Sequence, residues 1–241
     1  MIAPLAFLGS FGGAVEFIFE PQTTRFTGGR TVGGLDQVWE FTQTHIEISA
    51  VALAVSLVIA LPTGAVLGHY GKGETFAISV GNSWRGIPEL ALIALVVAFV
   101  GFGFLNVAIA LMVLGIPPIL TNSFVGVRQV DPNAVEAARG MGMNDFQILT
   151  RVELPLAVPT IMSGVRTGAI NIIATATIAP LAGVITLGDF ILGPNVYGDE
   201  GVIAGAILVA LLAILVELGL AGLQRLLTPK GLKLARQRAA A

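Results

Sequence analysis

Cysteine is absent from this sequence of 241 residues, and histidine occurs only at His45 and His69. Without cysteine the chain can form neither a disulfide framework nor a cysteine-based metal site. The two histidines stand on opposite sides of a long apolar stretch, which argues against a histidine-rich metal site. A P-loop is also missing, because Gly71-Lys72 would need a glycine at the position of Val66. We therefore expect no catalytic residue, metal or cofactor in this chain.

Charged residues are scarce as well. They make up 12% of the sequence, against about 25% in soluble domains, whereas hydrophobic residues make up 55% and the mean hydropathy is +0.86. This composition is typical of an integral membrane protein. We predict an all-α membrane protein, because a helix of about 20 apolar residues spans a bilayer and satisfies its own backbone. The length suits one bundle of about five spans.

Five apolar segments are long enough to be spans. They cover residues 46–67, 76–100, 104–127, 158–185 and 202–223. The apolar segment 1–19 has no basic start, so it is a poor signal peptide, and we favour an interfacial helix there, with a short span as the alternative. This divides the chain into an N-terminal interfacial and extracytoplasmic segment (1–45), a transmembrane domain (46–223) and a basic tail (224–241).

Lysine and arginine gather in alternate loops. One side holds Lys72, Arg128, Arg139, Arg151 and the basic tail, whereas the other holds only Arg25, Arg30 and the acidic segment 187–201. Cytoplasmic loops carry the excess of positive charge in membrane proteins. We therefore predict a multi-pass protein of the cytoplasmic membrane, in contact with lipid. Residues 128–157 and the C-terminus are expected inside, and residues 187–201 outside.

Residues 128–157, called the central loop below, are too polar to span a membrane. Long ordered loops are usually functional. Asp131-Pro132-Asn133 is typical of a helix start, and Gly140 and Gly142 are suited to ending that helix. A second short helix is predicted from Asp145, with Pro155 either closing it or beginning the next element.

The central loop contains a motif. Glu136-Ala137-Ala138, Gly142 and Val152-x-Leu154-Pro155 resemble, in register, the "EAA" loop of permease subunits in binding-protein-dependent ABC importers. The departure is Val152, where that family usually has isoleucine. A surface helix with a glycine turn would explain the helix but not the Leu-Pro pair at its fixed distance. The resemblance implies the type I ABC importer permease fold, with a coupling helix that sits in a groove of a cytoplasmic ATPase subunit.

The resemblance also implies contacts and partners. Contacts with the ATPase subunit are expected from Glu136, Ala137, Ala138, Gly140, Gly142, Leu154 and Pro155. Glu136 is the residue most associated with coupling, although an acid near a helix start can also serve only the helix dipole. The implied partners are an ABC ATPase subunit that binds ATP and magnesium, a separate extracytoplasmic binding protein, and a second permease copy or paralogue. No nucleic-acid partner is expected.

The expected substrate class is based on longer stretches of sequence in and after the central loop. Residues 131–143, 152–157 and 164–167 look like the osmoprotectant subfamily, which imports glycine betaine, choline or carnitine, whereas residues 184–188 depart from the Gly-Gly-Leu-Gly run that this subfamily often has. Aromatic cages bind quaternary ammonium groups, and no aromatic cluster in the spans is dense enough to predict one. The alternatives are a permease for another small solute, such as an amino acid or sulfonate, or an ion-coupled secondary transporter. The latter usually shows internal repeats, and we find none.

Two charged residues fall inside predicted spans. Arg166 lies about 12 Å into its span and Glu217 about 9 Å from the end of the last one, at 1.5 Å per residue. Charges inside a membrane need partners. We hypothesise an intramembrane ion pair between Arg166 and Glu217 near the cytoplasmic side. The alternative is that Arg166 extends to the lipid headgroups.

Overall fold

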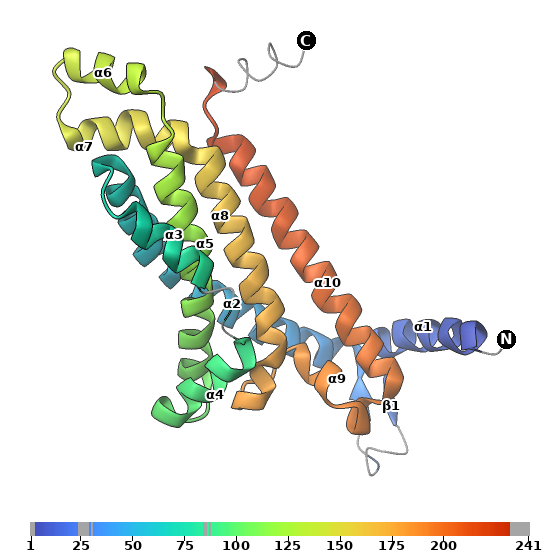
Figure 1. Ribbon diagram of the computed structural model, residues 1–241. Coiled ribbons are helices and arrows are strands. Elements are labelled where there is room, and N and C mark those ends of the chain that lie inside the picture. Colours follow the sequence, from blue (N-terminus) through green and yellow to red (C-terminus); the bar gives the residue numbers. More distant parts are fainter. Residues whose placement is uncertain (1–2, 24–28, 30, 84–85, 87, 232–241) are drawn as a thin grey trace. The chain divides into compact units, whose positions relative to one another are not determined.

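Helices dominate the computed structural model, which describes residues 3–23, 29, 31–83, 86 and 88–231 (Figure 1). Among these residues, four helical stretches are long and apolar enough to cross a membrane. They are α2 (Gly34–Tyr70), α5 (Phe104–Arg128), the continuous run Asp145–Ala182, and α10 (Pro194–Leu227). The predicted all-α class is confirmed; these stretches contain three of the five predicted spans and all but the last three residues of a fourth, 158–185. Arg25, Arg30 and the tail beyond Gly231 lie outside the described residues.

The fifth predicted span, 76–100, is not one helix. The structure divides it into α3 (Glu74–Ser83) and α4 (Glu89–Val100). Gly86 and Pro88 stand between them, and the backbone before a proline disfavours the helical conformation. The sequence prediction placed Asn82, Ser83 and Glu89 inside one span because most of residues 76–100 are apolar, whereas these polar residues in fact stand beside the break.

The boundaries of other spans differ as well. Helix α2 begins at Gly34, so the predicted boundary at residue 45 falls inside a helix. The polar residues there do not interrupt it, since the hydroxyl groups of Thr42 and Thr44 bond to carbonyl oxygens one turn back. Helix α10 continues to Leu227, beyond the predicted end at residue 223.

The contacts divide the chain into two compact units. Unit 1 contains Met1–Val51, Glu89–Leu111 and Ile172–Leu215, and unit 2 contains Ala52–Pro88, Met112–Asn171 and Val216–Ala241. The helices α2, α5, α8 (Leu154–Thr175) and α10 each contribute to both units.

Unit 1 begins with α1 (Ala3–Phe19) and a small hairpin. Strand β1 (Pro21–Thr23) pairs antiparallel with β2 (Thr31–Gly33), with Pro21 opposite Gly33. Gly33 and Gly34 have φ angles of 80° and 79°, which glycine adopts without strain. A Cβ on Gly33 would also lie 2.6 Å from the backbone oxygen of Phe17. The two glycines therefore allow the chain to turn directly from β2 into α2.

The core of unit 1 is aromatic. Phe17, Phe41, Phe190 and Tyr197 come from α1, α2, α9 (Gly188–Leu192) and α10, and all four are buried. The Phe17 and Phe190 rings meet edge to face at 5.4 Å, and those of Phe41 and Phe190 lie 4.7 Å apart. None of these four rings lies in a predicted span, so the cluster leaves the expectation of no dense aromatic cluster in the spans unchanged. These rings are far apart in the sequence, and they pack on one another as a core.

The acidic segment 187–201 is likewise not a simple loop. It contains α9 and the first turns of α10, with a kink at Gly198. The hydroxyl of Tyr197 donates to Oδ2 of Asp189 at 2.6 Å, and both Tyr197 and Phe190 are buried. Pro194 suits the first turn of a helix. The glycines suggested a loop, but burial of the aromatic rings makes the segment part of the core.

Unit 2 is packed around α5. A Cβ on Gly64 of α2 would lie 2.4 Å from the backbone oxygen of Leu120, and one on Gly164 of α8 would lie 2.5 Å from that of Pro118. Small residues let helix backbones approach this closely. The Gly-x-x-x-Gly pairs at 64–68 and 164–168 therefore serve packing within the chain, with α2 and α8 each packed against α5.

Candidate functional site

The first helix of the central loop is α6 (Pro132–Gly140), where the sequence predicts it. The Asp131 carboxylate caps it by accepting from the backbone N–H of Asn133 at 2.9 Å. At its other end Gly142 has a φ of 84°, and the N–H of Met143 donates to the carbonyl of Ala138 at 3.2 Å. The positive φ favours glycine at position 142, because glycine adopts it without strain and so permits the turn that ends α6.

The second helix, α7 (Asp145–Ile148), begins at the predicted residue. Asn144 and Gln147 form a capping box, each side chain accepting from the other's backbone N–H at 2.9 Å and 3.0 Å. The helix then continues through a π-helical turn, η2 (Leu149–Glu153), into α8. Pro155 therefore lies in the first turn of α8. The missing N–H of Pro155 is tolerated there because the regular hydrogen-bond ladder is already interrupted by the π turn.

The seven residues predicted to contact an ATPase subunit do not share one environment. Four are exposed on the central loop: Glu136, Ala137, Gly140 and Gly142. Ala138 is 1% exposed, and Leu154 packs against a core cluster of unit 2. Pro155 is half-buried. Ala138 is thus buried in the unbound chain, and its contact with an ATPase subunit stays a prediction.

Two exposed apolar residues of the central loop were not predicted from the sequence as site residues. Met141 is 72% exposed and Phe146 is 74% exposed, the first just after α6 and the second in α7. Large apolar side chains on a polar, water-facing loop suggest an interaction site. The sequence did carry a signal for these two residues, because a large apolar side chain is unusual in so polar a stretch.

A buried pair joins the central loop to α2. Nδ1 of His69, in the last turn of α2, lies 2.6 Å from Oε2 of Glu153, and the two side chains are 5% and 7% exposed. Nε2 of His69 lies 3.9 Å from Asp145, which also pairs with Arg139 at 3.5 Å on the surface. The sequence pointed to His69 only as a conceivable metal ligand, because no local pattern connects residues that are 84 positions apart.

The structure brings Arg166 and Glu217 together, within unit 2. Nε of Arg166 donates to Oε1 of Glu217 at 2.8 Å, and Nη2 donates to the same oxygen. Nη1 donates to Gln224 at 3.1 Å. The two charged side chains are 33% and 28% exposed, so each is partly covered. The arrangement holds the last turns of α10 against α8.

Removing either charge is expected to destabilise the protein, because the remaining one loses its partner in apolar surroundings. Arg166→Ala and Glu217→Ala should each lower the melting temperature in detergent by several degrees. The double variant should lower it by less than the sum of the two, since residues in contact are not additive. Arg225→Ala, at an exposed arginine of α10, is the control and should have little effect. Purely additive shifts would show that the pair contributes nothing.

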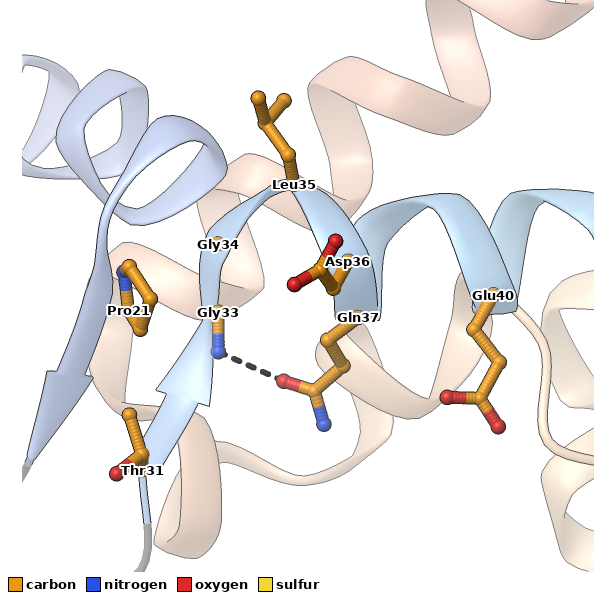
Figure 2. Close-up of a pocket in the computed structure, with 8 residues that line it drawn as sticks. All are labelled: Pro21, Thr31, Gly33, Gly34, Leu35, Asp36, Gln37 and Glu40. Carbon is orange, nitrogen blue, oxygen red and sulfur yellow. Dashed lines mark hydrogen bonds between the residues drawn. The ribbon is translucent and has the colours of Figure 1, made fainter.

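Other polar groups lie in unit 1. Nε2 of the buried His45 donates to the carbonyl of Ile173 at 3.1 Å, while its Nδ1 has no hydrogen-bond partner among the described residues. A pocket of about 370 Å³ lies between the hairpin and the start of α2 (Figure 2), where the Gly33 N–H donates to Gln37. Asp36 and Glu40 line it from successive turns of α2. Across the described ranges, no three histidine, aspartate or glutamate side chains gather as a metal site would require.

The comparison with protein families decides the class. Residues 60–230 match the family described as "Binding-protein-dependent transport system inner membrane component". The chain belongs to this family. The matched residues include the whole central loop and both partners of the Arg166–Glu217 and His69–Glu153 pairs. The chain is thus a multi-pass membrane component of a transport system.

Characterised relatives of this permease are similar over most of their length. It is 41% identical over 84% of its chain to the carnitine transport permease protein OpuCB of Listeria monocytogenes, covering 92% of that protein. It is 39% identical to the choline transport system permease protein OpuBB of Bacillus subtilis and 37% identical to its glycine betaine/carnitine/choline permease OpuCB, covering 89% of each and 80% of this chain.

Solved structures support the fold of the permease. An inward-facing form of the MetNI methionine ABC transporter superposes with a TM-score of 0.69 at 20% identity, over 81% of this chain and 100% of that one. An amino acid ABC transporter gives a TM-score of 0.59 at 19% identity, over 78% of this chain and 91% of that one. The permease therefore has the type I ABC importer permease fold that the sequence predicts.

Proposed function

We propose that this permease is the transmembrane subunit of an ABC importer for an osmoprotectant such as glycine betaine, choline or carnitine. The observation that carries this proposal is the identity of 37–41% to permeases named for these compounds, over at least 80% of the chain. The solved structures named for methionine and amino acid transport are only 19–20% identical and support the fold alone. They therefore do not favour an amino acid as substrate.

The central loop is the proposed docking site for the ATPase subunit. Its capped helices hold Glu136, Met141 and Phe146 on an exposed surface, so a charged group and two apolar groups face outward. Such a surface fits a partner groove with apolar pockets and a basic or hydrogen-bonding rim. In this proposal the partner binds ATP and magnesium, and this chain binds neither.

The remaining parts of the proposed importer follow from the orientation and the family description. The distribution of lysine and arginine supports a cytoplasmic central loop. A separate binding protein would deliver substrate at the opposite side, and a second permease copy or paralogue would complete the pathway. Closure of the ATPase subunits would move the central loop, and the spans would then switch from inward-open to outward-open.

Uptake in membrane vesicles tests this proposal. The permease is co-expressed with its ATPase and binding protein, and labelled glycine betaine, choline and carnitine are supplied with ATP. We expect ATP-dependent uptake of at least one compound. Glu136→Ala should reduce it by about tenfold, the factor equivalent to about 1.4 kcal/mol at an interface. Glu89→Ala, the same change at an exposed acid of α4, should leave it unchanged.

The other outcomes separate the parts of the proposal. If none of the three compounds is imported but the binding protein still stimulates ATP hydrolysis, the importer class stands and the osmoprotectant assignment fails. Uptake driven by an ion gradient without ATP would indicate a secondary transporter. If the chain does not associate with an ATPase subunit, the proposed role of the central loop is wrong.

A further inference from the structure

The His69 ring joins α2 to two separate elements of the central loop. It lies in the last turn of α2, with Nδ1 2.6 Å from Glu153 of η2 and Nε2 3.9 Å from Asp145 of α7. In this hydrogen bond Nδ1–H of His69 donates and the carboxylate oxygen of Glu153 accepts. One side chain from outside the loop thus contacts two loop residues on different helical turns.

Glu153 occupies the last position of the π-helical turn. The turn adds one residue to the helical repeat, and π turns of this kind often occur at functional sites. Glu153 is 5% exposed, whereas its neighbour Arg151 is exposed. A buried carboxylate is costly without a hydrogen-bonding partner. The helix therefore places Glu153 on the inner side of the loop, where His69 satisfies it.

The connectivity of the chain gives this contact its significance. Within the central loop, η2 continues directly into α8, and residues 129–131 lead from the end of α5 into α6. A displacement of the loop therefore reaches α5 and α8 through the backbone. Helix α2 has no such connection, because α3, α4 and α5 separate it from the loop in the sequence. Besides its packing against α5, α2 is joined to the loop by side-chain contacts such as His69–Glu153, which link the two elements directly.

We propose that His69 is a positioning residue that fastens the end of α2 to the central loop, so that α2 moves with the loop during transport. This inference rests on the proposed function, in which an ATPase subunit drives the loop. Of the contacts around His69, the hydrogen bond to the buried Glu153 is the one that should hold α2 to the loop. The Arg139–Asp145 pair is 64% and 56% exposed, and exposed pairs contribute little. Loss of the His69–Glu153 contact should therefore uncouple ATP hydrolysis from substrate delivery.

The test uses the complete transporter in proteoliposomes and measures stimulation of ATP hydrolysis by the binding protein. His69→Ala and Glu153→Ala should each reduce stimulation by about fivefold or more, the lower end of typical coupling factors. Combining them should cause little further loss, since both remove one contact. His69→Asn keeps a donor near the position of Nδ1 and should retain most of the stimulation. Lys72→Ala, at an exposed residue just beyond α2, is the control.

A chemical link provides a second, independent readout. The chain has no native cysteine, so His69→Cys combined with Glu153→Cys can be joined by a short bifunctional thiol reagent, with cysteine-free partner subunits. Stimulation should be low before linking and recover after it. A role limited to stability would instead lower the melting temperature without this recovery.

Two results distinguish the inference from the proposed function. If the unaltered permease shows no stimulation, the proposed function fails. If the unaltered permease is stimulated and the folded His69→Ala and Glu153→Ala variants are stimulated equally, the proposed function stands and the role of His69 is overturned. Failure of the linked cysteine pair to recover would also contradict it.

Discussion

Phe146→Ala is expected to weaken binding of the ATPase subunit by about thirtyfold, the factor equivalent to an interface hot spot of about 2 kcal/mol. Phe146 is 74% exposed at the first turn of α7, whose capping box holds it in a fixed position. The capping box fixes the backbone at this position, and an aromatic side chain has only two χ angles to order when it enters a partner pocket. Co-purification and titration of the ATPase subunit against detergent-solubilised permease would measure the effect.

The matched control is Phe102→Ala. Phe102 is also 74% exposed but lies between α4 and α5, outside the central loop. It loses the same ring, and binding of the ATPase subunit should not change. Equal weakening by both variants would indicate a general effect of exposed rings on the solubilised protein. Unchanged binding by Phe146→Ala would place the docking surface elsewhere on the loop.

Gly188→Ala is expected to cause the largest loss of stability. A Cβ at Gly188 would lie 1.8 Å from the carbonyl oxygen of Thr177, in the 3₁₀-helical turn η3 (Ala176–Ala182) that packs on α9. A backbone atom cannot move aside by changing a rotamer, so the cost should reach the upper range for overpacking, about 3 kcal/mol. For a chain of this size that corresponds to a melting temperature about 6–12 °C lower.

The control for this prediction is Gly222→Ala in α10. In the described part of the chain, no heavy atom other than those of its neighbours and of the adjacent helix backbone lies within 4 Å of the Cβ that this change adds. Alanine favours a helix more than glycine does, so this variant should be as stable as the unaltered protein or slightly more stable. A melting temperature of Gly188→Ala within about 2 °C of the unaltered value, less than about 1 kcal/mol, would show that α9 can move away from η3.

The sequence determined what depends on local chemistry. Hydropathy identified the apolar helices, and the caps and glycines located α6 and the start of α7 within a residue or two. These features depend on a residue and its near neighbours along the chain, as hydrogen-bonded turns and apolar runs do. The motif around Glu136 and Gly142 likewise pointed to the family, and the match over residues 60–230 shows it.

Only the tertiary structure decided which residues meet and which face outward. His69 and Glu153 are 84 positions apart, and the rings of Phe17 and Phe190 come from opposite ends of the chain. The burial of Ala138 and the exposure of Phe146 also depend on how α6 and α7 pack within the loop. A sequence pattern specifies helices, but contacts between helices depend on complementary surfaces that form only when the chain is folded.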